Sequence, residues 1–331
     1  MKYQNWINKI SFVCAALLFV SCVFAQSEDR TYKDKGFSCK YQIKYGMLHG
    51  HYESFYKNGT KKSEGTFEYN HRIGEWSVWD STGKLRVKRI YSNPLEYKQV
   101  IPVVSPDGPI PMLNKPLYTL QRDSLGEWKY YFLHERMCAY RQRNFKCFYT
   151  REKQLFFDCK TLFNILYTNA KKKNCTVYGT NKHDEDDTYS VGKLDIATID
   201  TSKIKLVGFR VKSDFIFDNT RFLSQDIPLF ITPLVVTKVS PTDTFDLFNV
   251  YVPHVRKYLA QVKLTYPDLP SYLQNLDDVF FFECFSTDKW RASGVFDGIH
   301  DTSVRTPKSS ANKFQLGEVE TENDLWLHFN K

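Results

Sequence analysis

The chain of 331 residues lacks the short signatures of the common enzyme classes. It contains no Gly-x-Ser-x-Gly nucleophile turn, no His-Glu-x-x-His zinc motif, no phosphate-binding loop and no dinucleotide fingerprint. No Cys-x-x-Cys pair occurs, so a structural zinc site is not expected. The paired acids Asp277 and Asp278 could serve acid–base chemistry, but negative charge at a helix start explains them more simply. We therefore expect no catalytic residue, cofactor or metal, and a hydrolase with a dispersed site is the remaining enzymatic alternative.

Glycine and proline are also scarce, at 15 and 13 residues, which argues against a low-complexity chain. Hydrophobic residues make up 42% of the sequence and aromatic residues 16%, a composition that favours β-rich structure with a packed core. The net charge of +9 is spread over many segments and includes no arginine-rich run. We therefore expect no nucleic-acid partner and, at most, peripheral contact with a membrane.

Long apolar runs are missing except at the N-terminus. Residues 1–25 predict a secretory signal, in which two lysines precede the apolar run Ile10–Val20. That run is too short to span a bilayer comfortably. Acylation of Cys22 is the competing interpretation, and it is disfavoured because the usual preceding leucine is missing. The predicted location is the periplasm, where the six remaining cysteines could form disulfides of unassigned pairing.

The chain repeats itself with an offset of 24 residues, because Tyr41–Glu64 and Gly65–Lys88 align position by position. Each unit predicts two short strands joined by turns, with its aromatic residues on one face of a meandering sheet. Glycine tolerates the positive φ that tight turns require. The glycines predicted to occupy the two kinds of turn are Gly50, Gly59, Gly74 and Gly83.

This pattern resembles the MORN-type repeat, particularly the variant of YwqK-like antitoxin proteins, over residues 41–92. The resemblance implies an interaction surface, and it makes Trp76 and Trp79 candidate partner-binding residues. A purely structural extension of the β-sheet is the alternative.

Composition divides the rest of the chain. Residues 26–40 are polar and predict a flexible lead-in. Residues 93–127 hold six prolines and predict a linker. Residues 128–305 predict an α+β domain, and residues 306–331 predict a tail whose apolar cluster folds back. The acidic run His183–Asp187 predicts a solvated loop, because it lacks the ligand spacing of a calcium site.

Periodicity places the elements of the second domain. Asp158 is a candidate N-cap for a helix that ends near Lys173. Alternating apolar residues predict strands within residues 202–218, and a further apolar stretch over 227–236 contains two prolines that restrict it to an edge or irregular position. Near the C-terminus, Pro253 suits the first turn of a short helix.

Two blocks of this domain resemble the GldN/PorN family, ring subunits of the type IX secretion and gliding machinery. The matching residues of the first block are Val252-Pro253, Arg256, Leu259-Ala260 and Asp277-Asp278-Val279-Phe280. Those of the second are Thr161-Leu162-Phe163, Thr176-Val177-Tyr178, Asp186-Asp187-Thr188-Tyr189 and Leu194-Asp195-Ile196. The candidate family-motif or partner-binding residues are therefore Pro253, Arg256, Asp277, Asp278 and Phe280.

The expected fold is α+β, an N-terminal antiparallel β-meander of MORN-like hairpins followed by a GldN/PorN-like domain. The resemblance implies a non-enzymatic periplasmic assembly role, a GldK/PorK-like lipoprotein as partner, and a possible homo-oligomer. Typical members lack the repeats, so the chain could instead be an accessory or paralogue. The alternative function is a free periplasmic module whose repeats bind a protein or the envelope.

Overall fold

The structure is a computed structural model. It describes residues 27–34, 36–102, 121–130, 137–151, 153–179, 194, 196, 199–267, 269–287, 289–294 and 311–329. The predicted signal over 1–25, the acidic run and the centre of the proline-rich segment lie outside these residues. Within them, none of the helices combines the length and the apolar character that a membrane crossing requires.

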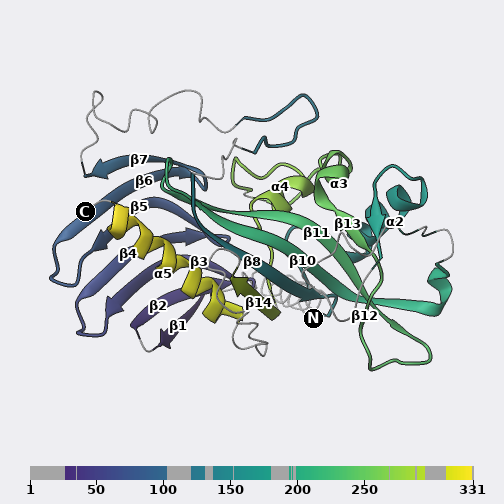
Figure 1. Cartoon of the computed structure of the whole chain (residues 1–331), viewed down its shortest axis with the longest axis horizontal. Helices are drawn as coiled ribbons and strands as arrows, with labels where there is room; N and C mark the ends of the chain where they lie inside the picture. Colours follow the sequence, from purple (N-terminus) through teal and green to yellow (C-terminus); the bar gives the residue numbers. More distant parts are fainter. Residues whose placement is uncertain are drawn as a thin grey trace, which may run out of the picture.

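An antiparallel meander of seven strands forms the N-terminal part, which we call the repeat sheet (Figure 1). Its strands are β1 (Glu28–Lys33), β2 (Phe37–Lys44), β3 (Met47–Tyr56), β4 (Lys61–Glu68), β5 (His71–Trp79), β6 (Leu85–Asn93) and β7 (Glu96–Ile101). The sheet is wider than the two predicted units. The flexible lead-in was wrong over residues 28–33, which pair with β2 through backbone hydrogen bonds although their side chains are mostly exposed. The linker was likewise wrong at its start, where β7 pairs with β6.

The turns of the repeat sheet differ from the prediction at one end. Gly59 and Gly83 lie in the outer turns, with φ of 84° and 86°. Gly50 and Gly74 lie instead inside β3 and β5, with φ of 107° and 60°. Gly50 makes room for a neighbour, because a Cβ there would lie 2.0 Å from the side-chain oxygen of Gln42. The inner turns are Tyr45-Gly46 and Tyr69-Asn70, all in the left-handed region.

A second antiparallel sheet contains strands that are far apart in sequence. They are β8 (Cys138–Tyr149), β9 (Val177–Tyr178), β10 (Ile204–Asp218), β11 (Leu223–Thr237), β12 (Phe245–Asp246), β13 (Asn249–Tyr251) and β14 (Lys289–Gly294). Their order is β14-β8-β10-β11-β13-β9, with β12 also paired to β11. The proline-containing strand β11 does not lie at an edge, since it lies between β10 and its short partners. It is irregular instead, which is the other position expected for it. Pro228 lies at a register shift, and the carbonyl of Pro233 accepts from Leu247 N at 2.9 Å.

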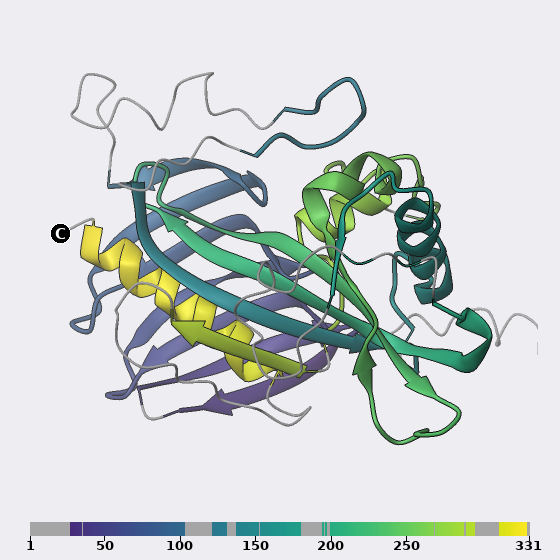
Figure 2. The same ribbon diagram turned by 45° about the vertical axis from the view of Figure 1, so that its right-hand side comes forward.

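Three helices pack around one end of the long β10–β11 hairpin, and α5 lies at the other end (Figure 2). Helix α2 (Cys159–Lys171) begins at the predicted cap, where Asp158 accepts from Thr161 N at 2.9 Å. Helix α3 (Val252–Leu259) has Pro253 in its first turn. Helix α4 (Leu276–Phe281) has a capping box formed by Asn275 and Asp278. The cap at Asp158 and the first-turn Pro253 therefore lie at helix starts, where the sequence predicts them.

The β10–β11 hairpin contributes to both hydrophobic cores. Phe209 and Val211 lie in the core shared with α2, α3 and α4. Phe217 and Phe222, near the tip, lie in the core of the repeat sheet. That second core is closed by α5 (Ala311–Phe329), whose Trp326 is fully buried. The predicted tail therefore folds back as a helix, and the overall class is α+β.

Candidate functional site

The paired acids at the start of α4 hold two arginines from elsewhere in the chain. Arg122 donates to both carboxylate oxygens of Asp278, at 2.7 and 2.8 Å. It also donates to the carbonyl of Tyr272 at 3.1 Å and lies 4.0 Å from the ring centroid of Trp128. The segment 121–130, which was predicted as linker and domain boundary, is thus bound across the helix start. A bidentate arginine gives this contact both strength and a fixed geometry.

Asp277 forms the second pair, with Arg256 of α3. The guanidinium donates to the two carboxylate oxygens at 3.0 and 2.7 Å, and Nη2 also donates to the carbonyl of Trp128 at 2.7 Å. The carboxylate is 1% exposed. Burial raises the pKa of Asp277, and the hydrogen bonds from Arg256 oppose that rise. The two aspartates therefore tie α3, α4 and segment 121–130 into one unit.

This arrangement suits a structural joint better than a reaction centre. Both carboxylates accept from an arginine, and both are buried. Across the described ranges, no group of three or more His, Cys, Asp or Glu side chains could hold a metal ion. Phe280 is fully buried beside the joint, and Pro253 is exposed at the start of α3. Among the family-motif residues, Pro253 is therefore the one that is exposed.

The tryptophans of the repeat sheet also differ in position. Trp76 has no exposed surface, because α5 covers the face on which it lies. Trp79 is partly exposed at the end of β5. As a fully buried residue, Trp76 packs within the fold and is not displayed to a partner. The aromatic pattern of the repeats therefore marks the covered face of the sheet.

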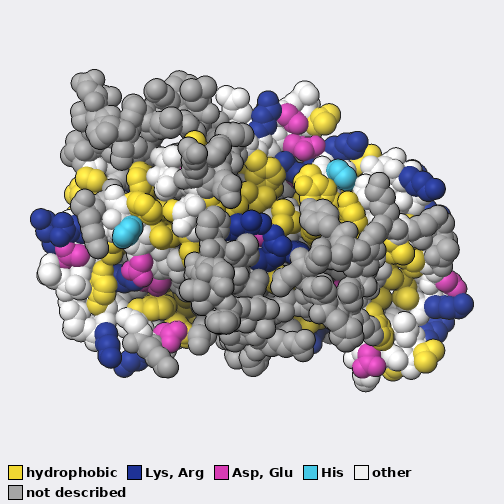
Figure 3. Space-filling model, viewed as in Figure 1, with side chains coloured by type: hydrophobic (Ala, Val, Ile, Leu, Met, Phe, Trp, Pro, Cys, Tyr) yellow, Lys and Arg dark blue, Asp and Glu magenta, His cyan; other side chains and the backbone are white. Residues whose placement is uncertain are grey.

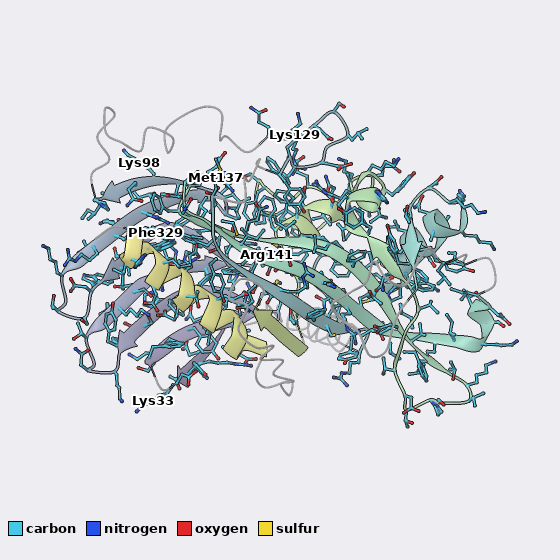
Figure 4. The ribbon with its side chains drawn as sticks, in the orientation of Figure 1. Lys33, Lys98, Lys129, Met137, Arg141 and Phe329 are labelled. Carbon is cyan, nitrogen blue, oxygen red and sulfur yellow. The ribbon has the colours of Figure 1, made fainter. Side chains whose placement is uncertain are left out.

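Helix α5 is attached to that face by charged as well as apolar groups. The guanidinium of Arg72 lies between the rings of Trp76 and Trp326, at 4.9 and 4.6 Å from their centroids. Arg72 also pairs with Glu322 and donates to the carbonyl of Val319 at 3.1 Å. At the C-terminal end of α5, Phe329 stacks on Phe217 with 5.9 Å between ring centroids (Figure 4).

A second group of contacts fixes the middle of α5. Glu320 accepts from the hydroxyl of Tyr52 at 2.7 Å and pairs with Lys62 at 2.8 Å. Lys62 also pairs with Asp324 at 2.7 Å. Burial and the nearby Glu320 raise the pKa of Tyr52 well above its usual value, so its hydroxyl stays a donor. Helix α5 is thus part of the core of the repeat sheet and not a mobile tail.

Residues 133–327 match the family model described as gliding motility associated protein GldN. The chain belongs to the GldN family. The matched region includes the whole second sheet, which begins with β8, and α5 up to Leu327. The repeat sheet lies outside it. Comparison with curated proteins gave no match. Family membership assigns the chain to the gliding motility and type IX secretion machinery, an envelope-associated assembly with protein partners.

The inner turns of the repeat sheet are anchored in the GldN region. The ring of Tyr69 lies 5.0 Å from that of Phe156 and belongs to the GldN-region core. Asn70 Nδ2 donates to the carbonyls of Glu283 and Phe285 at 3.2 and 3.3 Å. In the equivalent turn 24 residues earlier, the Tyr45 hydroxyl lies 3.1 Å from that of Tyr266.

Sequence reasoning missed these anchoring residues, although a signal for them was present. Tyr45 and Tyr69 occupy equivalent repeat positions, each followed by Gly46 or Asn70, the residue types that favour a left-handed turn. That signature could have placed the turns at these residues. It could not have shown that the turns meet the GldN region.

The outer face of the repeat sheet is polar. It carries basic and acidic side chains that form ion pairs with one another. Lys40 pairs with Glu53 at 3.1 Å, and Lys88 pairs with Glu75 at 2.7 Å. Ile90 lies among these residues with 43% of its surface exposed. On the face of the molecule shown in Figure 3, basic and acidic side chains also lie side by side at both ends. Over the described residues, the surface therefore suits a protein partner with matching charges better than a uniformly charged polymer.

Proposed function

We propose that this chain is a non-catalytic assembly subunit of the type IX secretion and gliding machinery that acts in the periplasm. The supporting observation is the double attachment of the repeat sheet, through its inner turns and through α5, to the GldN region. Because these contacts join the two modules at both places, we expect them to act as one body. Such a body suits a ring-like subunit, or an accessory that uses the same contacts.

The partner we propose is a lipoprotein of the GldK/PorK type. The outer face of the repeat sheet supplies charged side chains on neighbouring strands, and the exposed Pro253 lies at the start of α3. Complementary charges fix the register of an interface more than its strength. The MORN-like character of the repeats is part of this proposal, as a partner-binding surface built on a structural sheet.

Co-purification from envelope extracts tests the proposal. The wild-type chain should recover the lipoprotein and form arcs or rings by electron microscopy. The charge-reversal variants Lys40→Glu and Lys88→Glu should weaken recovery about tenfold or more when combined. The combined variant Lys160→Glu and Lys205→Glu, at exposed positions of α2 and β10, changes the net charge by the same amount and is the matched control. Full recovery by the double variant would exclude the outer face as the interface.

A free periplasmic module that binds a protein or the envelope is the second candidate. It is favoured by the position of the repeat sheet outside the family match. This function predicts that the chain is recovered without secretion-ring components and stays monomeric. Alanine substitutions at Asp277, Asp278 and His254 that abolished a measurable turnover would instead favour an enzyme.

Export is tested on the mature chain. Cleavage after Ala25 should leave Gln26 as the first residue in the periplasmic fraction. An acylated Cys22 as the first residue would show that the chain is itself a lipoprotein.

A further inference from the structure

Strand β1 forms one open edge of the repeat sheet, at the lower side of the molecule in Figure 1. Among the described strands it pairs with β2 alone. All of its side chains are exposed except that of Tyr32, which is partly buried, and Lys33 points outward at its end (Figure 4). An edge strand offers a row of backbone groups to which another chain can add a strand. Strand β1 therefore adds little to the core of its own sheet and presents an edge to the outside.

The backbone groups that face outward follow from the pairing of β1 with β2. At the turn between these strands, Asp34 N donates to the carbonyl of Phe37 at 2.8 Å, so these two residues form a hydrogen-bonded pair. Along an antiparallel ladder such pairs alternate with pairs that exchange no hydrogen bond. Counted from Asp34, the residues Asp29, Thr31 and Lys33 belong to the second kind. Their N–H and C=O groups therefore point away from β2, toward any strand that adds to this edge.

The side chains of β1 complement those of a second, antiparallel copy of the same strand. A two-fold axis at Thr31 places Asp29 of each copy opposite Lys33 of the other. The same axis places the cation of Arg30 beside the ring of Tyr32. Charged residues on an edge usually oppose strand addition. In this arrangement opposite charges meet, and cross-strand pairs of opposite charge stabilise a sheet.

We propose that two copies of this chain pair through β1, so that their repeat sheets join into one antiparallel sheet about a two-fold axis at Thr31. The outward backbone groups of Asp29, Thr31 and Lys33 then all find partners in the second copy. Closed two-fold pairs are the commonest assembly of identical chains. The interface is small, so we expect a dissociation constant on the order of 10 μM.

Other registers fit this edge less well. An axis between two residues would set the outward groups of one copy against residues whose groups point inward. An axis at Arg30 would bring two guanidiniums together, and an axis at Tyr32 would leave Asp29 opposite the turn and not the strand.

The ends of the paired strands tolerate the axis at Thr31. There Glu28 faces Asp34 of the other copy. Each carboxylate already accepts a hydrogen bond within its own copy, Glu28 from Arg30 at 2.8 Å and Asp34 from the Tyr32 hydroxyl at 2.9 Å. This dimer requires neither a lipoprotein nor a ring, so its failure would leave the proposed function unchanged.

Cross-linking of the purified chain tests the register. In a hydrogen-bonded pair the two Cα atoms lie about 5.5 Å apart, a separation that a disulfide spans. Thr31→Cys should therefore form a covalent dimer with a mild oxidant, as seen on a non-reducing gel. Lys33→Cys is the matched control, because its two copies would lie more than about 13 Å apart along the strands. Absence of the Thr31→Cys dimer, or equal cross-linking of Lys33→Cys, would overturn the proposal.

A charge exchange tests the same pairing without a cross-link, by sedimentation velocity at several concentrations. Asp29→Lys sets like charges against each other at both symmetry-related positions and should weaken dimerisation about tenfold or more. Lys33→Asp should do the same, and the two changes combined should restore the wild-type dissociation constant. Both residues are exposed, so the fold tolerates these variants. A chain that stays monomeric at every concentration, or a dimer that neither single variant weakens, would contradict pairing through β1.

Discussion

The repeat sheet and the second sheet are both antiparallel, yet they are assembled in different ways. In the repeat sheet every strand pairs with its neighbour in sequence. In the second sheet β14 pairs with β8, and β8 pairs with β10, across long stretches of chain. The repeat sheet nevertheless takes its core from distant segments, namely α5 and the tip of the β10–β11 hairpin. Local pairing therefore does not make a module independent.

The largest expected effect tests the joint of the second region. Arg256→Met leaves the buried carboxylate of Asp277 without its cation, and should reduce the free energy of unfolding by about 3–5 kcal/mol. Urea denaturation, followed by circular dichroism, measures the loss. Lys257→Met, one residue along and exposed, is the control and should change little. A loss below about 1 kcal/mol would show that the joint contributes little to stability.

Trp326→Ala tests whether the repeat sheet depends on α5. Removing this fully buried ring should cost about 3–5 kcal/mol, because it leaves a cavity beside Arg72 and Arg89. If the two sheets unfold together, this variant and Arg256→Met both lower the Tm of one shared calorimetric transition. Two separate transitions, of which Trp326→Ala lowers the Tm of the repeat sheet alone, would show that the modules unfold independently. His328→Ala, on the exposed side of α5, is the control.

Much of the repeat sheet could be predicted from the sequence, because its pattern is local. Alternation with period two and the glycine turns at Gly59 and Gly83 require no knowledge of distant residues. The additional strands β1 and β7 escaped prediction because their residues are polar or only partly buried. Backbone hydrogen bonds hold these two strands in the sheet. Such bonds leave no alternating pattern of buried residues from which the strands could be predicted.

The candidate site was predictable only in part for a related reason. The helix start at Asp277 and Asp278 follows from charge and capping rules. The partner of Asp278 could not be inferred, since Arg122 lies 156 residues away in a segment that resembles a linker. Trp76 was interpreted as a possible contact residue because nothing in its own repeat shows that α5 covers it. Long-range contacts decide which aromatic residues are displayed.

A moderate effect is expected where the two regions meet. Glu283 has a pKa raised to about 8 by burial, so the stability it contributes is present below pH 4.5 and is lost as the pH rises through 8. Glu283→Gln should flatten the dependence of unfolding free energy on pH between 5 and 8. The raised pKa already includes the opposing charge of Lys146, so linkage predicts that the wild type loses a few kcal/mol more than the variant between pH 5 and 8. An unchanged pH profile would contradict this assignment.

The smallest effect is expected on the outer face. Lys40→Ala removes an exposed ion pair with Glu53 and should change the free energy of unfolding by at most about 0.5 kcal/mol. The same variant measured in high salt should be indistinguishable from the wild type. A loss above about 1 kcal/mol would mean that the outer face supports the sheet as its covered face does.

The two inner turns restrict how this protein can gain or lose hairpins. Tyr45 and Tyr69 each meet a fixed place in the GldN region, so duplication of a unit between them would displace one from its contact. A unit added before β1 would leave both turns where they are, because β1 is the edge of the sheet. Lengthening of the array, by evolution or by engineering, should therefore proceed from an edge of the sheet, at β1 or β7, and not between the two turns.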